Sequence, residues 1–297
     1  MKKLLAILLA AIMLLTVCAC SNTDNKNKND LSDLIEEDVV ITFEKMENGD
    51  TFHFESIDSE TVRITKYTGV DTPHAVTIPG TLNGKTVTEI GVSAFYYSSQ
   101  ITSITIPASV TKIDDFAFAG CAALTELAIP ATIQSIGVAA FYDCSALTTV
   151  TFPAESALTT IEQHTFTKCT ALTEISIPAY IETIGTAAFL GCSDLASITI
   201  AEGCVLVGAQ AFQDCTALAS LTLPASVASI GTYAFSGSEN LYGEGVTCPA
   251  GSVAEQFIAN MYLEPTAPVI PDEEETTEEV TDEVTEEVTD EATQPAA

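Results

Sequence analysis

Apolar and polar residues follow one another along most of this chain in a pattern that recurs at an almost constant interval. Each copy of the pattern contains one phenylalanine, and successive phenylalanines lie 23 residues apart, except for one interval of 25. A fixed period of roughly 20 to 50 residues is typical of solenoids, in which each unit buries its apolar side only against its neighbours. The pattern therefore predicts a solenoid of about seven units, marked by Phe95, Phe118, Phe141, Phe166, Phe189, Phe212 and Phe235.

The first half of a unit has the pattern of a short strand. In the copy that begins at Leu124, the apolar residues Leu127 and Ile129 alternate with positions that would point outward, as a half-buried strand requires. Pro130 then ends the strand, because proline lacks the N–H group that a ladder hydrogen bond needs. The same apolar-Pro pair recurs in most units, with Ile200 followed by Ala201 as the exception.

The second half of a unit has a spacing that suits a helix. After Pro130, apolar residues occur at Ile133, Ile136, Ala140 and Phe141, at spacings of three, four and one. This spacing predicts one or two turns of helix whose inner face rests on the strands. Glycines are expected to form a tight bend between strand and helix, at Gly91, Gly137, Gly185, Gly208 and Gly231.

Stacking of these units would place the phenylalanines in a column behind a continuous sheet, with rungs about 4.8 Å apart. Burial of each ring contributes roughly 1.5 to 3 kcal/mol, which makes the column a main source of cohesion. We therefore interpret the phenylalanines as core residues and not as an aromatic cage for a ligand. The extra residues near 154–156 are expected to form a local bulge within a single array.

The repeats are flanked by segments of different composition. Residues 21–37 are polar and predict a flexible linker, whereas residues 38–77 contain runs with strand character and predict a β cap over the first unit. A solenoid over residues 78–248 would be followed by a helical cap over residues 249–263, which Ser252 opens as N-cap. Residues 264–297 carry 13 acidic side chains and no basic one, which predicts a disordered acidic tail.

The first 20 residues have the pattern of a signal peptide. Two lysines precede an apolar run that is too short to span a bilayer comfortably. The end of this segment, VCAC at residues 17–20, resembles a bacterial lipobox, in which a small residue precedes a cysteine that receives a lipid. The resemblance implies that Cys20 becomes the lipidated N-terminus, held in the membrane by acyl chains. The alternative is an ordinary secretory signal with two incidental cysteines.

The repeated phrase as a whole resembles the BspA-like leucine-rich repeat family over about Thr61 to Leu263. The resemblance implies an α/β repeat, a right-handed leucine-rich-repeat solenoid with one short strand and one short helix or irregular turn per unit. It also implies a bacterial surface protein, and some members of the family are adhesins for host matrix proteins such as fibronectin. The residues that carry it are Ile177-Pro178, Ile181, Ile184-Gly185, Ala188-Phe189, Gly191-Cys192, Leu195, Ile198 and Ile200.

Cysteines follow the repeat as well. Two of the seven cysteines after Cys20, Cys204 and Cys248, align with apolar positions of other copies. An extracytoplasmic location permits disulfides, but side chains stacked on successive rungs point in parallel and not toward one another. We therefore expect buried free thiols, and the linear arrangement does not favour a zinc site. The other five lie three residues after a repeat phenylalanine, at Cys121, Cys144, Cys169, Cys192 and Cys215.

The charge of the chain limits its partners. The formal net charge is −31, and no Lys or Arg follows Lys168. Such a surface repels nucleic acid and anionic membranes, so membrane contact is expected only through the lipid anchor. The histidines, His53, His74 and His164, lie apart from Cys and Ser motifs and are expected on the surface. The sequence contains no phosphate-binding loop or nucleophile motif, and it predicts neither an enzyme nor a cofactor.

The strand positions that point outward form the candidate binding surface. They make a flat, hydroxyl-rich face with two acids, which offers hydrogen bonds and little hydrophobic anchorage. We expect a monomeric, extracytoplasmic protein, lipid-anchored at the cell surface, that binds an extracellular protein or glycan through this face and functions in adhesion. The alternative is a structural or scaffolding module of the cell envelope without a host ligand. The candidate residues are Ser103, Thr105, Glu126, Thr149, Thr151, Glu174, Ser176, Ser197, Thr199, Ser220 and Thr222.

Overall fold

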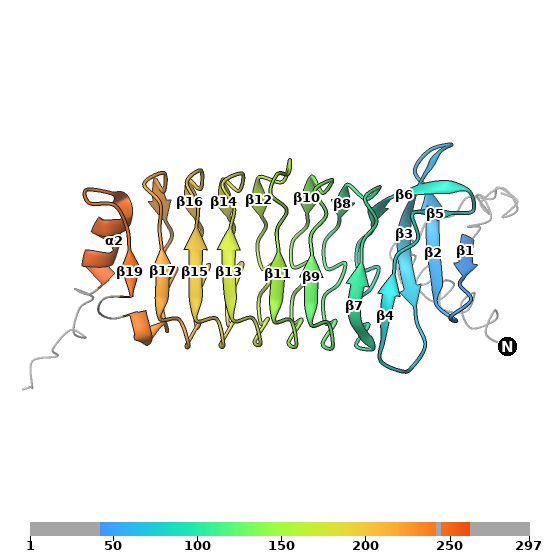
Figure 1. The fold of residues 1–297 in the computed structure, drawn as a ribbon, viewed down its shortest axis with the longest axis horizontal. Helices are drawn as coiled ribbons and strands as arrows, with labels where there is room; N and C mark the ends of the chain where they lie inside the picture. Colours follow the sequence, from blue (N-terminus) through green and yellow to red (C-terminus); the bar gives the residue numbers. More distant parts are fainter. Residues whose placement is uncertain (1–41, 242–244, 262–297) are drawn as a thin grey trace, which may run out of the picture.

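The computed structural model describes residues 42–241 and 245–261. These residues form an elongated parallel β-solenoid of about eight turns, with the N-terminal strands at one end and a helix at the other (Figure 1). The predicted solenoid is therefore confirmed. The predicted signal peptide, the lipidated Cys20, the linker and the acidic tail lie outside the described residues.

The N-terminal end begins with an antiparallel sheet. Strands β1 (Thr42–Lys45), β2 (Thr51–Ser56) and β3 (Thr61–Thr68) pair in sequence order. Strand β3 then pairs in parallel with β6 (Lys85–Ile90), which also pairs with the short β5 (Thr81–Leu82), and β4 (His74–Thr77) pairs in parallel with β7. The parallel ladders of the solenoid thus start within residues 61–77, inside the segment predicted as a cap.

Each coil of the solenoid contributes two strands. The first row, whose strands the sequence pattern predicts, consists of β7 (Ile101–Thr105), β9 (Glu126–Ala128), β11 (Thr149–Thr151), β13 (Glu174–Ile177), β15 (Ser197–Ile200), β17 (Ser220–Thr222) and β19 (Val246–Thr247). The second row consists of β8 (Lys112–Ile113), β10 (Ser135–Ile136), β12 (Thr160–Ile161), β14 (Thr183–Ile184), β16 (Leu206–Val207) and β18 (Ser229–Ile230).

The prediction of a helix in the second half of each unit is wrong, because a short strand followed by turns forms there instead. The stretch from Ile133 to Phe141 forms strand β10 and then turns, and its apolar side chains are buried because the chain bends around them. The second residue before the phenylalanine has a positive φ in every coil, which an α-helix does not allow. The N–H of Phe118, for example, donates to the carbonyl of Ala140 in the next coil. The left-handed residues are Ser93, Phe116, Ala139, His164, Ala187, Gln210 and Tyr233.

Glycine is required at these recurring positions for a different reason from the one predicted. Gly185 does not have a positive φ, but a Cβ atom there would lie 2.7 Å from the backbone nitrogen of Gln163 in the preceding coil. Gly208 and Gly231 are equally close to the backbone of the coil before them. These glycines therefore permit neighbouring coils to approach closely, instead of forming a bend between strand and helix.

The phenylalanine column forms the centre of the core, as predicted. Neighbouring rings from Phe95 to Phe235 are stacked with centroids 4.7 to 5.5 Å apart. Tyr67 extends the column at the N-terminal end with a stacked contact of 4.9 Å. At the other end, Phe257 meets Phe235 edge-on, with centroids 6.2 Å apart.

The two extra residues near 154–156 divide the sheets. The first-row ladder runs from β4 to β11 and restarts at β13, and the second-row ladder ends at β10 and restarts at β12. The bulge predicted in this unit therefore has a larger effect than expected. Across this junction the coils are held by the ring stacking of Phe141 on Phe166 and by turn hydrogen bonds, such as that from Phe141 N to Thr165 O.

The C-terminal end contains a 3-10 turn η2 (Glu239–Leu241), strand β19 and helix α2 (Val253–Met261). The hydroxyl of Ser252 accepts a hydrogen bond from the N–H of Glu255, and the Glu255 carboxylate accepts one from the N–H of Gly251, so Ser252 caps the start of the helix. Within residues 42–241 and 245–261, no helix is long and apolar enough to cross a membrane.

Candidate binding surfaces

The structure places all the candidate strand residues on one row of parallel strands, β7 to β17. Nine of them are exposed, and Ser197 and Thr222 are half-buried. Because the strands pair in register, equivalent residues lie beside one another. Glu126 is opposite Ser103 and Thr149, and Glu174 is opposite Ser197. The junction between β11 and β13 divides this row into two patches, which sequence reasoning did not anticipate.

Hydroxyl groups at the start of these strands donate along the solenoid axis. The Oγ1 atoms of Thr125 and Thr148 donate to the carbonyl oxygens of Thr102 and Thr125, at 3.1 and 2.9 Å. These threonines fix their own rotamers in this way and leave lone pairs for an incoming donor. The strand row is thus a flat, preorganised set of small polar groups, suited to an extended contact.

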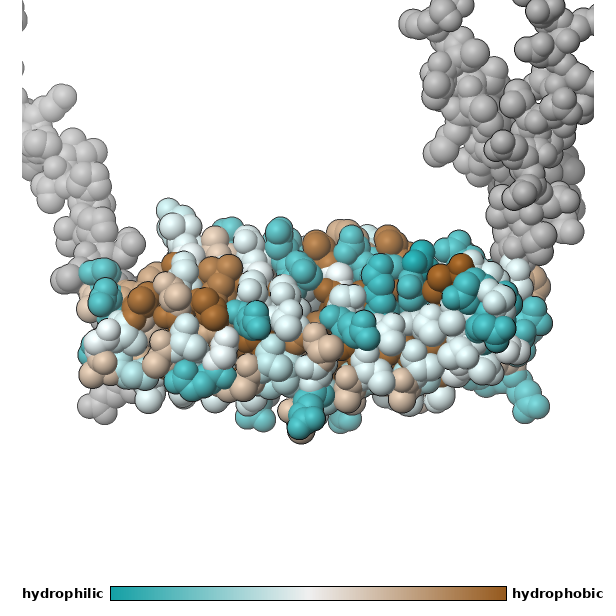
Figure 2. Space-filling model, turned by 90° about the horizontal axis from the view of Figure 1, so that it is seen from above, coloured by the Kyte–Doolittle hydropathy of each residue, from teal (hydrophilic) through white to brown (hydrophobic). Residues whose placement is uncertain are grey.

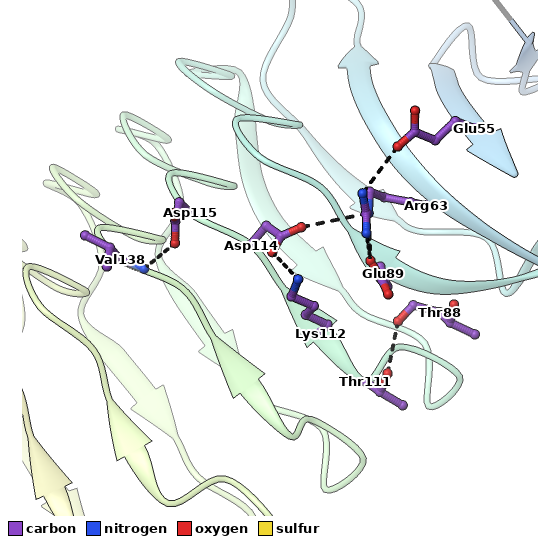
Figure 3. Close-up of polar contacts among 9 residues, drawn as sticks. All are labelled: Glu55, Arg63, Thr88, Glu89, Thr111, Lys112, Asp114, Asp115 and Val138. Carbon is purple, nitrogen blue, oxygen red and sulfur yellow. Dashed lines mark hydrogen bonds and ion pairs between the residues drawn. The ribbon is translucent and has the colours of Figure 1, made fainter. Parts of the chain in front are cut away.

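A charged cluster on strands β2, β3, β6 and β8 and the turn after β8 was not predicted (Figure 3). Arg63 Nε lies 2.6 Å from the Glu89 carboxylate, and the guanidinium also contacts Glu55 at 3.3 Å and Asp114 at 3.9 Å. Lys112 Nζ lies 2.7 Å from Asp114. The hydrogen bond with Glu89 is the main cause that raises the pKa of Arg63. The Arg63 side chain is 32% exposed and that of Glu89 is 19% exposed, so the cluster links strands β2, β3 and β6 at the edge of the core.

The 23-residue period could have revealed part of this cluster. Glu89 and Lys112 are 23 residues apart and are register partners on β6 and β8. Arg63 lies in the irregular N-terminal strands, outside the period, and its position beside Glu89 follows only from the pairing of β3 with β6. The remaining contacts in Figure 3 are of the repeat type, with Thr111 donating to Thr88 O and Val138 N to Asp115 Oδ1.

A network of polar side chains links the N-terminal hairpin to the start of β4 and the loop before it. Asp50 is 1% exposed and accepts hydrogen bonds from the Tyr67 hydroxyl at 2.8 Å and from the Asn48 amide at 2.8 Å. His74 Nε2 lies 3.0 Å from the same carboxylate, and its Nδ1 lies 2.8 Å from Thr72 O. Burial, followed by the Asp50 contact, raises the pKa of Tyr67. The expectation of a surface histidine is therefore wrong for His74, which is part of a largely buried network.

The cysteine ladder consists of free thiols within the core. Each Sγ of the five column cysteines donates to the carbonyl oxygen of the phenylalanine in the preceding coil, at 3.2 to 3.5 Å. Desolvation raises the pKa of Cys121 and Cys215 to about 12 and that of Cys204 to about 11. A thiol that is buried and protonated is neither a good nucleophile nor a metal ligand.

Thiol titration of a chain that starts at residue 21 tests this arrangement. We expect Cys248, which is half-buried, to react with a thiol reagent in the native protein at pH 8. The six buried thiols should react only after denaturation, because their carbonyl contacts and burial protect them. A count of seven reactive thiols in denaturant without reductant would support free cysteines, whereas a count of five, three or one would show one, two or three bridges.

The other surfaces contain no metal cluster among the residues that the structure describes. Figure 2, seen from above the view of Figure 1, shows hydrophilic side chains interspersed with small, separate groups of hydrophobic ones. In the second row, Val205 and Leu206 are exposed where most other coils have polar residues. The described surface in this view is therefore mixed, without one large apolar patch.

Comparison with known proteins agrees with the fold. The family model of the BspA type leucine rich repeat region matches in six copies over residues 88–218 and 159–243. The structure is similar to the T. pallidum leucine rich repeat protein TpLRR, with 27% sequence identity and a TM-score of 0.59 over 71% of this chain and 92% of that one.

A second solved structure, a leucine-rich repeat protein from Eubacterium ventriosum, is 28% identical with a TM-score of 0.55. The similarity covers 66% of this chain and 50% of that protein, so the chain spans half of that relative's length. No curated protein matches the chain significantly. The family model alone covers more than half of the 297 residues, and the chain therefore belongs to the BspA type leucine rich repeat family, whose solenoids are generally non-enzymatic scaffolds for protein interaction.

Proposed function

We propose that this chain is a lipid-anchored protein of the bacterial cell surface that binds an extracellular protein through the strand row β7 to β17, and that this binding serves adhesion. The observation that carries the proposal is the row of exposed small polar residues on a regular, flat backbone. Side chains that differ between coils, such as Glu126 and Ala128 against Thr149 and Thr151, give this row an individual pattern. The core positions of the same coils hardly vary.

The charge of the molecule supports a basic partner. The net charge is −31, and the described residues after Lys168 include acids but no Lys or Arg. Complementary charge accelerates association and selects partners more than it raises affinity. A basic protein surface would meet Glu126 and Glu174 on the strand row without a large apolar contact.

Substitution of small strand residues by bulky ones tests the proposal. Thr149→Trp and Thr199→Trp each place a large ring on the face, and each should reduce binding to an immobilised matrix protein such as fibronectin by about tenfold or more, because the ring prevents close contact. Surface plasmon resonance with a panel of matrix proteins and glycans would measure this reduction in binding. The matched control is Ser135→Trp, which adds the same ring to an exposed position of the second row.

Binding that is unchanged in both strand-row variants would contradict the use of this face. If the wild type binds only envelope components or itself, the chain is a scaffolding module of the envelope instead. Mass spectrometry of the mature N-terminus tests the anchor separately, since lipidation adds the mass of acyl chains to Cys20.

A further inference from the structure

Exposed aromatic side chains gather on the turns that follow the phenylalanine column, away from both strand rows. Tyr96 and Tyr97, directly after Phe95, are 51% and 61% exposed. Two coils farther along, Tyr142 lies in the same turn, and the ammonium of Lys168 is 5.7 Å from the centre of its ring. We call Tyr96, Tyr97, Tyr142 and Lys168 the tyrosine cluster.

The cluster is held in place by the coils beneath it. The rings of Tyr96 and Tyr97 contact each other edge-on, with centroids 4.5 Å apart and an angle of 81°. Tyr97 lies over Gly120 of the next coil, where a Cβ atom would come within 2.6 Å of the Tyr97 ring. The backbone N–H of Tyr97 donates to Ala119 O at 2.8 Å, so the residue is fixed at both its ring and its backbone. Such preorganisation lowers the entropic cost of binding.

The aromatic groups of the cluster lie close to charged ones. The pKa of Tyr97 is raised, first by its interaction with Tyr96 and further by Asp143 and Tyr142. The pKa of Lys168 is raised mainly by Tyr142. Asp143 itself is held by a backbone hydrogen bond from its N–H to Thr167 O. The ammonium of Lys168 thus lies over one ring of the cluster, and Asp143 directly follows that tyrosine in the same turn.

A row of hydroxyls lies farther along the solenoid, in the short turn that follows the buried cysteine of each coil. Thr170, Ser193 and Thr216 each donate their hydroxyl hydrogen to a carbonyl of the preceding coil, at 3.2 to 3.4 Å. Their hydrogens are thus in use, and the oxygen lone pairs remain as acceptors, one per coil. The coil spacing, measured by the stacked rings, is 4.7 to 5.5 Å, which is comparable with the length of one sugar residue in an extended chain.

We propose that the tyrosine cluster and this hydroxyl row form a binding site for a linear, uncharged oligosaccharide that runs along the solenoid axis. The C–H face of a pyranose packs on a tyrosine ring, while its hydroxyls meet Asp143, Lys168 and the row of lone pairs. An anionic polysaccharide is disfavoured because Lys168 is followed only by acids. The site uses none of the candidate strand-row residues, so either proposal can fail without the other.

Titration of the full-length chain with defined hexasaccharides tests the proposal. The probes are cellohexaose and N-acetylchitohexaose, which are uncharged, and a hyaluronan hexasaccharide, which is anionic. The chain contains eight tyrosines and no tryptophan, so tyrosine fluorescence reports stacking directly and calorimetry gives the affinity. We expect at least one uncharged probe to bind and to bind more tightly than hyaluronan.

The matched variants are Tyr97→Ala and Tyr233→Ala. Both remove an exposed tyrosine, but Tyr233, which is 66% exposed, lies in the last coil, away from the cluster. Tyr97→Ala should weaken binding by about tenfold or more, as expected for loss of an aromatic anchor, and Tyr233→Ala should leave it within about twofold. Unchanged unfolding curves for both variants would show that the fold is intact. The proposal is overturned if neither uncharged probe binds, if hyaluronan binds best, or if Tyr97→Ala binds like the wild type.

Discussion

Raising the pH from 9.5 to 10.5 should lower the free energy of unfolding by several kcal/mol through the cysteine column alone, at about 1 kcal/mol per thiol. Burial raises the pKa of all five column thiols, with Cys121 and Cys215 at about 12. The unfolded thiols, with an ordinary pKa of 9.0, release their protons in this range, whereas the native thiols keep theirs. The stability that the five thiols contribute is thus fully present below their unfolded pKa of 9.0. It is lost as the pH rises from there toward the native pKa values.

Urea unfolding followed by circular dichroism at several pH values, with reductant present, measures this loss. Cys215→Ala removes one titrating thiol and should reduce the pH-dependent loss by about 1 kcal/mol. Leu218→Ala is the matched control, because the Leu218 side chain is also 0% exposed but has no ionisable group. It should lower stability equally at every pH. A wild-type stability that does not change between pH 9.5 and 10.5 would contradict the thiol arrangement.

Phe166→Ala should destabilise the solenoid by about 3 to 5 kcal/mol, the usual cost of removing a buried phenylalanine, and should also separate its unfolding into two steps. Phe166 is 1% exposed and stacks on Phe141 across the junction where both strand ladders stop. Neighbour contacts couple the coils of a solenoid, so loss of this contact leaves the two halves joined mainly by turn hydrogen bonds. Urea unfolding should then show two transitions.

The control for this prediction is Phe189→Ala. Phe189 is 0% exposed and stacks on Phe166 and Phe212 at 5.3 and 5.1 Å, but its coil lies between unbroken ladders. A similar loss of stability with a single transition is expected for this variant. If both variants unfold in the same number of steps, the junction is no weaker than its neighbours.

The core of the fold could be predicted because it is strictly periodic. The phenylalanine interval identifies the column, and the alternation around Leu127 and Ile129 identifies the first strand row. The second row was missed, since a strand of two residues such as Ser135–Ile136 is too short for alternation to show. The inward-facing residues of a tight bend, from Ile133 to Phe141, then imitate helical spacing.

Left-handed residues could not be predicted for a related reason. Phe116 and Ala139 have φ values of 56° and 54°, a conformation that bulky or β-carbon-bearing residues rarely adopt. They are held there by hydrogen bonds between coils, such as that from Ala139 N to Gln163 O. No local signal in the sequence indicates bonds that depend on the neighbouring coil.

The surface residues also fall into a set that could be predicted from the sequence and a set that could not. The outward positions of the strand row follow from alternation within one unit, so their exposure could be predicted. The tyrosine cluster and the Arg63 cluster combine residues from two or more coils, and Arg63 comes from the irregular N-terminal strands. The two-residue insertion could be seen in the sequence, but its effect on the ladders depends on the pairing of whole strands.

The interrupted ladders also determine how the rod responds to tension. When the two ends are pulled apart, the coils act in series and each junction carries the same load. The junction between β11 and β13 has no strand ladder to share that load, so we expect it to yield first. The rod would then part into two halves, each with a continuous ladder and its own stretch of the phenylalanine column, instead of unravelling coil by coil from an end.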